Sequence, residues 1–150
     1  DEVKKEVLVS IRGLQFVDNE VGQSATDEDL DQIETICPGE YYYRNDAHYI
    51  RYEEILDDFP ESIRNMIKLK GKEFSLWKKG PINVQLVFSE GKKTMTDYVT
   101  PFGNIIVAMD TQEVNVTESD DCLQIHIAYG LEANYQFIAD CNITIEIKEL

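Results

Sequence analysis

The chain has 150 residues and a formal net charge of −15, because 29 acidic side chains outnumber 14 basic ones. A surface this acidic repels phosphate backbones and anionic lipids, which argues against nucleic acid and membranes as partners and favours a basic ligand or protein. No apolar run reaches the roughly 18 residues that a membrane-spanning helix needs.

Length and cysteine content indicate the number of domains and the cellular compartment. A chain of this size is typical of one domain with a full hydrophobic core, and we expect a single domain over residues 1–150. Three cysteines are an odd and low number, which suits a reducing compartment. We therefore expect a cytoplasmic location.

Apolar and polar residues alternate with a period of two along much of the chain, which is typical of half-buried antiparallel strands. This alternation predicts, in chain order, strands over residues 7–12, 34–44, 48–55, 63–69, 73–79, 82–88, 95–99, 105–109, 123–131 and 137–148. The last is the clearest, with Phe137, Cys141, Ile143 and Ile147 expected on one face. The stretch 56–65, which contains Pro60, fits a short helical turn.

Turn-forming residues separate these strands at intervals of about 8 to 12 residues, the spacing typical of sandwiches and barrels. The sharpest turn is Thr100-Pro101-Phe102-Gly103, with Pro at the second and Gly at the fourth position of a type I turn. The predicted fold is therefore all-β: an antiparallel, closed or nearly closed barrel of about 8–10 strands, of the lipocalin-like kind.

The segment 18–31 has six acidic residues, no basic residue and little apolar content, and we expect a solvated loop there. Asp27, Asp29 and Asp31 match the first, third and fifth positions of a calcium loop, but Gln32 and Pro38 stand where Gly and Glu are needed. The histidines and cysteines lack zinc-ligand spacing. No metal or cofactor is predicted.

The cysteines are not expected to form a disulfide. If the last two strands form a hairpin around residues 132–136, Cys141 faces Ile127 rather than Cys122. Bringing the two thiols together would need a slip of five residues, roughly 17 Å along a strand, whereas a disulfide needs Cα atoms within about 7 Å.

Functional side chains gather most densely over 41–44 and 48–54, in two predicted strands joined by Asn45-Asp46. The cluster holds five tyrosines, two arginines, two glutamates and one histidine. A period of two puts Ile50, Tyr52 and Glu54 on one face of the second strand. Because Ile50 is apolar, we expect this face to point into the barrel.

The candidate ligand-binding residues are Tyr43, Tyr52, Glu54 and Arg64. A buried carboxylate must be paired or hydrogen-bonded, and Arg64 or a tyrosine hydroxyl is the expected partner of Glu54. The alternative is structural: tyrosine favours strands, and Arg and Glu pair across the outer face of a sheet.

These residues also carry a family likeness. The stretch 49–54, the turn 100–103, Thr111 and the closing strand 142–149 resemble the YwiB-like family, a bacterial family of calycin-like β-barrels with no assigned function. The likeness covers the chain from about residue 39 onward and the first strand. It implies a nearly closed antiparallel barrel, a cytoplasmic location and a cavity able to hold a ligand, and it transfers no catalytic residues.

The leading functional hypothesis is a barrel that binds a small, largely apolar ligand. One alternative is a cofactor-free acid–base enzyme built on Tyr43, Tyr52, Glu54 and Arg64, although enzymatic activity is not favoured. The other is a packed barrel that holds no ligand and meets a protein partner through its outer surface. An interior cavity of about 300 Å³ or more would favour the first two, and a filled barrel the third.

Overall fold

The computed structural model describes residues 4–13 and 34–150, which form ten strands and no helix. The strands are β1 (Lys5–Arg12), β2 (Glu34–Arg44), β3 (Ala47–Glu54), β4 (Ile63–Lys70), β5 (Glu73–Lys79), β6 (Val84–Ser89), β7 (Lys93–Thr100), β8 (Gly103–Glu118), β9 (Cys122–Ala133) and β10 (Gln136–Glu149). The predicted acidic loop 18–31 lies outside the described residues. Within those residues, no helix could cross a membrane.

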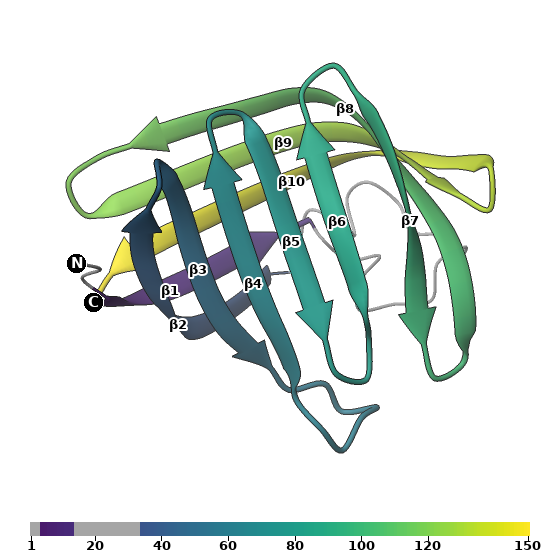
Figure 1. The fold of residues 1–150 in the computed structure, drawn as a ribbon, viewed down its shortest axis with the longest axis horizontal. Coiled ribbons are helices and arrows are strands. Elements are labelled where there is room, and N and C mark those ends of the chain that lie inside the picture. Colours follow the sequence, from purple (N-terminus) through teal and green to yellow (C-terminus); the bar gives the residue numbers. More distant parts are fainter. Residues whose placement is uncertain (1–3, 14–33) are drawn as a thin grey trace.

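All ten strands belong to one antiparallel sheet with the order β6-β5-β4-β3-β2-β1-β10-β9-β8-β7. The sheet curls so that β2 to β6 cross in front of β9 and β10 in Figure 1. Its two edges meet at one bridge, where the Asn83 amide donates to the Val99 carbonyl at 2.9 Å and the Val99 amide returns a bond at 3.1 Å. The predicted all-β, nearly closed barrel is confirmed.

Apolar side chains fill the barrel interior in rows that follow the strand register. One row runs across four neighbouring strands through Ile50, Ile67, Leu76 and Leu86, each at most 1% exposed. Phe88 of β6 meets Tyr129 of β9 edge-to-face, with ring centroids 4.9 Å apart. Side chains from two separate parts of the wall therefore touch inside the barrel, as in barrels that are filled rather than hollow.

The last hairpin departs from the predicted register. It turns at Asn134 and Tyr135, both with positive φ, and a bulge lies between Phe137 and Ala139. The short turn and the extra bulge residue each move the pairing by one position, so Cys141 faces Tyr129 rather than Ile127. Phe137, predicted to point inward, is 65% exposed.

The rest of that strand follows the prediction, because the residues after the bulge keep their period of two. Cys141, Ile143 and Ile147 are all buried. Cys122 lies opposite Lys148, seven positions along β10 from Cys141. Seven strand residues span about 23 Å, which is far beyond disulfide reach.

The segment between β3 and β4 is a loop rather than the predicted helical turn. The Phe59 amide donates to the Leu56 carbonyl at 3.1 Å, and both side chains pack partly buried against the core. Strand β4 begins already at Ile63, since Ile63, Asn65 and Ile67 alternate inward. The apolar residues of this stretch therefore continue a strand pattern instead of a helical one.

Candidate functional site

The structure separates the four predicted site residues. Tyr52 and Glu54 are buried beside Ile50, as the alternation predicts. Tyr43 is 50% exposed and contacts the ring of His48. Arg64 lies opposite Glu53, on the other face of the sheet from Glu54.

Of the two predicted partners of Glu54, Arg64 is therefore wrong. Residues directly opposite in an antiparallel pair share a face, and Glu54 is opposite Ile63, so the neighbouring Arg64 must point outward. The actual partner is Lys78 of β5, whose ammonium group forms a buried ion pair with the Glu54 carboxylate. Lys78 is only 2% exposed.

Asn65 completes this buried cluster. Its side-chain oxygen accepts a bond from the Lys78 ammonium at 2.9 Å, and its nitrogen donates to the Ile63 carbonyl at 3.2 Å. Tyr52, Asn65 and Lys78 lie directly opposite one another on β3, β4 and β5. Within the packed wall, the Lys78 ammonium is thus paired with Glu54 and hydrogen-bonded to Asn65. Such pairing offsets the desolvation cost of burying the two charges.

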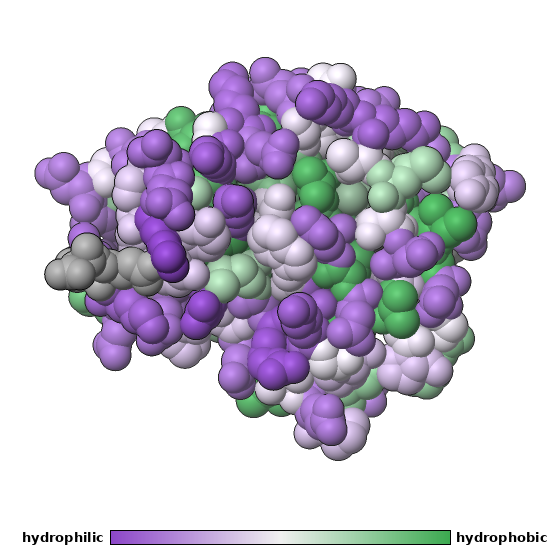
Figure 2. All heavy atoms as spheres, in the orientation of Figure 1, coloured by the Kyte–Doolittle hydropathy of each residue, from purple (hydrophilic) through white to green (hydrophobic). Residues whose placement is uncertain are grey.

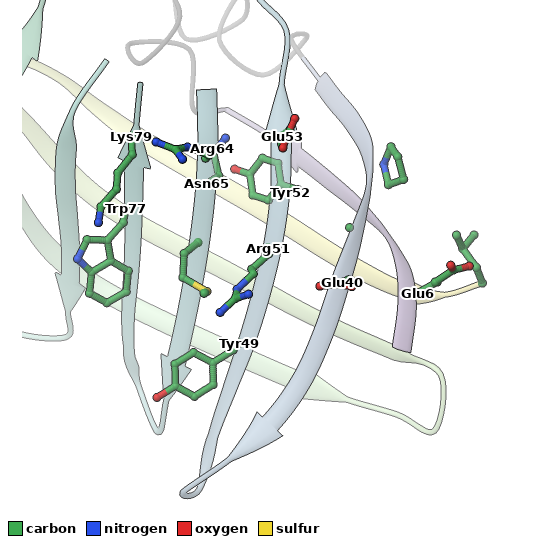
Figure 3. Close-up of a pocket in the computed structure, with 14 residues that line it drawn as sticks. Glu6, Glu40, Tyr49, Arg51, Tyr52, Glu53, Arg64, Asn65, Trp77 and Lys79 are labelled. Carbon is green, nitrogen blue, oxygen red and sulfur yellow. The ribbon is translucent and has the colours of Figure 1, made fainter. Parts of the chain in front are cut away.

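A groove of about 1090 Å³ lies on the outer face of β1 to β5. Most of its lining side chains alternate with core residues along each strand, so they point away from the barrel interior. The predicted site residues Tyr52 and Arg64 both line it, Tyr52 together with Asn65 from the buried cluster and Arg64 from the outer face. We call this hollow the outer groove; the lining residues that matter below are Glu6, Glu40, Tyr49, Arg51, Glu53, Arg64, Met66, Trp77 and Lys79. Figure 3 shows how they spread over neighbouring strands.

The floor of the outer groove is apolar and aromatic. Arg51, Met66 and Trp77 are directly opposite one another on β3, β4 and β5, so one row brings a guanidinium, a thioether and an indole together. Figure 2 shows hydrophobic and weakly polar side chains in the middle of this face, with hydrophilic ones around them. Trp77 is the chain's single tryptophan.

A stack of cations and aromatic rings borders this floor. The rings of Tyr42 and Tyr49 are parallel with centroids 4.9 Å apart. Arg51 lies 5.6 Å from the Tyr42 centroid, and Lys68 lies 5.8 Å from the Tyr49 centroid. Cation–π contacts and ring stacking hold these side chains against one another on the outer face.

Charge is divided across the outer groove. Glu6 and Glu40 line it on β1 and β2, whereas Arg64 and Lys79 line it on β4 and β5. Lys68 and Lys70 continue the cationic side along β4 beside a smaller hollow, where Glu73 of β5 lies opposite Lys70. The β4–β5 side is thus locally basic on a chain of net charge −15.

A second polar cluster joins β2, β3 and β8. The Tyr41 hydroxyl and His48 Nδ1 are 2.7 Å apart, and His48 Nε2 is 3.5 Å from the Glu118 carboxylate. Burial lowers the pKa of His48, and Glu118 opposes that shift. Burial also raises the pKa of Tyr41, reinforced by Glu118. The adjoining hollow is about 180 Å³, below the roughly 300 Å³ of ordinary small-molecule pockets.

Sequence reasoning missed Lys78, Asn65 and Trp77. The sequence predicts strand 73–79 without assigning its two faces, so it does not distinguish Lys78 from the adjacent Lys79. The apolar residues Phe74 and Leu76 carry the signal, because a period of two from them places Lys78 inside and Trp77 outside. Among the described residues, no group of three or more His, Cys, Asp or Glu side chains could hold a metal.

The fold has known relatives. Among solved structures it is similar to the YwiB protein from Bacillus subtilis, with a TM-score of 0.74, 18% sequence identity, and coverage of 98% of this chain and 93% of that one. At this identity the likeness shows the fold alone. No curated protein matches the chain. Residues 19–145 match the family described as "Domain of unknown function (DUF1934)". The chain therefore belongs to that family, in agreement with its resemblance to YwiB-like proteins.

Proposed function

We propose that the protein is an interaction module, with a packed barrel as scaffold and the outer groove as the site that binds an extended segment of a partner protein. The observation that carries this proposal is the row of Arg51, Met66 and Trp77 beside the stacked tyrosines, all on one regular sheet face. Aromatic residues, Met and Arg are the side chains enriched at protein interfaces, and Trp, Tyr and Arg dominate their binding energy.

The size and openness of the site favour a peptide segment over a small molecule. The outer groove, at about 1090 Å³, is slightly larger than the roughly 300 to 1000 Å³ typical of small-molecule pockets, which enclose most of their ligand. Most of its lining side chains belong to the outer face of the sheet. An extended chain can follow such a surface and place alternate side chains on it.

The interior supports the hypotheses of a small apolar ligand or an acid–base enzyme less well. Tyr52 and Glu54 were expected to line a cavity, but Glu54 is engaged with Lys78 within the packed wall. Tyr43 and Arg64 do not join them. The four residues on which the acid–base enzyme would depend therefore do not form one cluster. We keep a cytoplasmic location as part of the proposal, since three thiols suit a reducing compartment.

A random peptide library provides the test. Peptides selected on the wild-type protein are labelled, and their affinities for the wild type and two variants are compared by fluorescence anisotropy. We expect Trp77→Ala to weaken binding by at least about tenfold, the effect of an interface hot spot. Tyr135→Ala, which removes an exposed ring at the β9–β10 turn, serves as the matched control and should leave affinity unchanged.

A second reading comes from the protein itself. Because Trp77 is the single tryptophan, its emission reports directly on the outer groove. Selected peptides should shift that emission in proportion to occupancy. Peptides that bind wild type and Trp77→Ala equally, and leave the emission unchanged, would place the binding surface elsewhere and overturn the proposal.

A further inference from the structure

The cationic side of the outer groove has an arrangement that a sheet surface normally avoids. Arg64 of β4 and Lys79 of β5 are directly opposite each other in the register. Like charges in that position destabilise a strand pair. Glu53 offsets Arg64 from β3, but two cations still face each other on the wall of a hollow that is open to a partner.

The apolar floor lies directly beside these two cations. Met66 follows Arg64 by two residues on β4, and Trp77 precedes Lys79 by two residues on β5, so each strand presents one apolar and one cationic side chain to the groove. Same-face side chains on a strand are about 6.7 Å apart. A segment in extended conformation repeats at the same distance.

Resting on the proposed function, we infer that the partner segment is acidic where it meets β4 and β5. An acidic side chain lies between Arg64 and Lys79, and an aromatic or aliphatic side chain two residues away covers Met66 and Trp77. A carboxylate relieves the repulsion between the two cations and gains charge-assisted hydrogen bonds, to which the Arg guanidinium is well suited. The local charge thus reverses the basic partner expected from net charge alone.

A peptide fits the charge pattern better than a nucleic acid. Glu6, Glu40 and Glu53 also line the outer groove, and a continuous phosphate backbone would run against them. A peptide can carry its acidic residues on one side only. At physiological ionic strength charges are screened beyond about 8 Å, so the adjacent cations outweigh the distant acidic surface for a docked side chain.

The test uses three synthetic octapeptides that differ only in charge: two repeats of Glu-Ser-Tyr-Ser (the Glu-Tyr peptide), of Lys-Ser-Tyr-Ser (the Lys-Tyr peptide) and of Ser-Ser-Tyr-Ser (the Ser-Tyr peptide). In an extended chain each of them alternates the varied residue and tyrosine along one face. Their affinities are measured by Trp77 emission and by anisotropy, with an octathymidine strand as the nucleic acid probe. We expect the Glu-Tyr peptide to bind at least about tenfold more tightly than the Ser-Tyr peptide. The double variant Arg64→Glu/Lys79→Glu should abolish that preference and retain Ser-Tyr binding.

The variant Lys92→Glu/Lys148→Glu is the control, because it changes net charge equally at two exposed sites outside the groove lining. It should keep the preference for the acidic peptide. Equal binding of the three peptides would overturn the inference and leave the proposed function standing. Absence of binding by all of them would count against both. Tighter binding of octathymidine, lost in the Arg64→Glu/Lys79→Glu variant, would assign the site to nucleic acid and also overturn the inference.

Discussion

The inner and outer faces of β3 to β5 are built from the same three short stretches of sequence, yet they do different work. Lys78 and Lys79 are neighbours in the chain. Lys78 points inward and forms a buried ion pair with Glu54, whereas Lys79 points outward and lines the groove. Identical side chains one residue apart therefore have opposite surroundings, because successive side chains of a strand point to opposite faces.

The inner face therefore contributes mainly to the stability of the fold, and the outer face is available for binding a partner. The inner charges are surrounded by packed apolar rows, so removing one of them leaves the other desolvated and unpaired. The outer charges stay in contact with water and contribute little to folding. Substitutions on the outer face can therefore change the affinity for a partner without changing the fold, which is the property that an interaction surface needs.

The largest expected effect comes from breaking the inner pair. Lys78→Ala should lower the free energy of unfolding by about 3–5 kcal/mol, since Glu54 is left buried without its counter-charge. Lys79→Ala should change it by less than about 0.5 kcal/mol, as exposed substitutions usually do. Urea denaturation of the two variants measures both. Equal midpoints would show that the two faces are not distinguished as described.

Replacing both members of the inner pair sharpens the same comparison. Glu54→Leu/Lys78→Met removes both charges and keeps apolar volume, so it should recover most of the stability that Lys78→Ala loses, to within about 1–2 kcal/mol of wild type. The measurement is again urea denaturation, with each single variant completing the cycle. A double variant as unstable as Lys78→Ala would show that Asn65 and its hydrogen bonds, rather than the charges, dominate the cluster.

The sequence predicts the fold well because period-two alternation is a local signal. It places Ile50, Tyr52 and Glu54 correctly on the inner face. The partner of Glu54 could not be found this way, since Lys78 is 24 residues away and its approach depends on the register of β3, β4 and β5. Register follows from turn length and bulges, which also explains the shifted pairing of Cys141.

The outer groove could not be predicted from the sequence either, because it too depends on the register of neighbouring strands. A period of two puts Tyr49, Arg51 and Glu53 on the opposite face of β3 from Ile50, but nothing local shows that Met66 and Trp77 complete that face. The alternative given above, that Arg and Glu simply pair across strands on an outer sheet face, explains why Glu53 is opposite Arg64. It does not account for Arg64 opposite Lys79. The candidate site thus emerges from three strands aligned side by side, and no single segment contains it.

The cation–aromatic stack gives an intermediate effect and tests whether the outer face has packing of its own. Tyr42 points outward but is only 8% exposed, because Tyr49 and Arg51 cover it. Tyr42→Ala should cost about 1–2 kcal/mol from the lost ring pair and cation–π contact. Tyr135→Ala, at an exposed turn, is the control and should cost less than about 0.5 kcal/mol in the same thermal or urea unfolding experiment.

The smallest expected effect concerns the cluster of Tyr41, His48 and Glu118, in which His48 lies at the start of β3 on its inner face. Burial lowers the pKa of His48 below its ordinary 6.5, and the Glu118 carboxylate partly opposes this. Glu118→Gln removes the opposing charge while burial remains. The pKa of His48 should therefore fall further, as an NMR titration of the ring can measure. A His126→Gln background assigns the signal, since the chain has two histidines.

The same shift has a defined sign in stability. A histidine whose pKa is lowered by folding binds protons more readily in the unfolded chain, so stability is lost as the pH falls from 6.5 through the folded pKa. Glu118→Gln should deepen that loss, and His48→Gln should remove this part of the pH dependence. An unchanged or raised His48 pKa in Glu118→Gln would show that the 3.5 Å contact carries no electrostatic weight in solution. The cluster would then be held by the Tyr41 hydrogen bond alone.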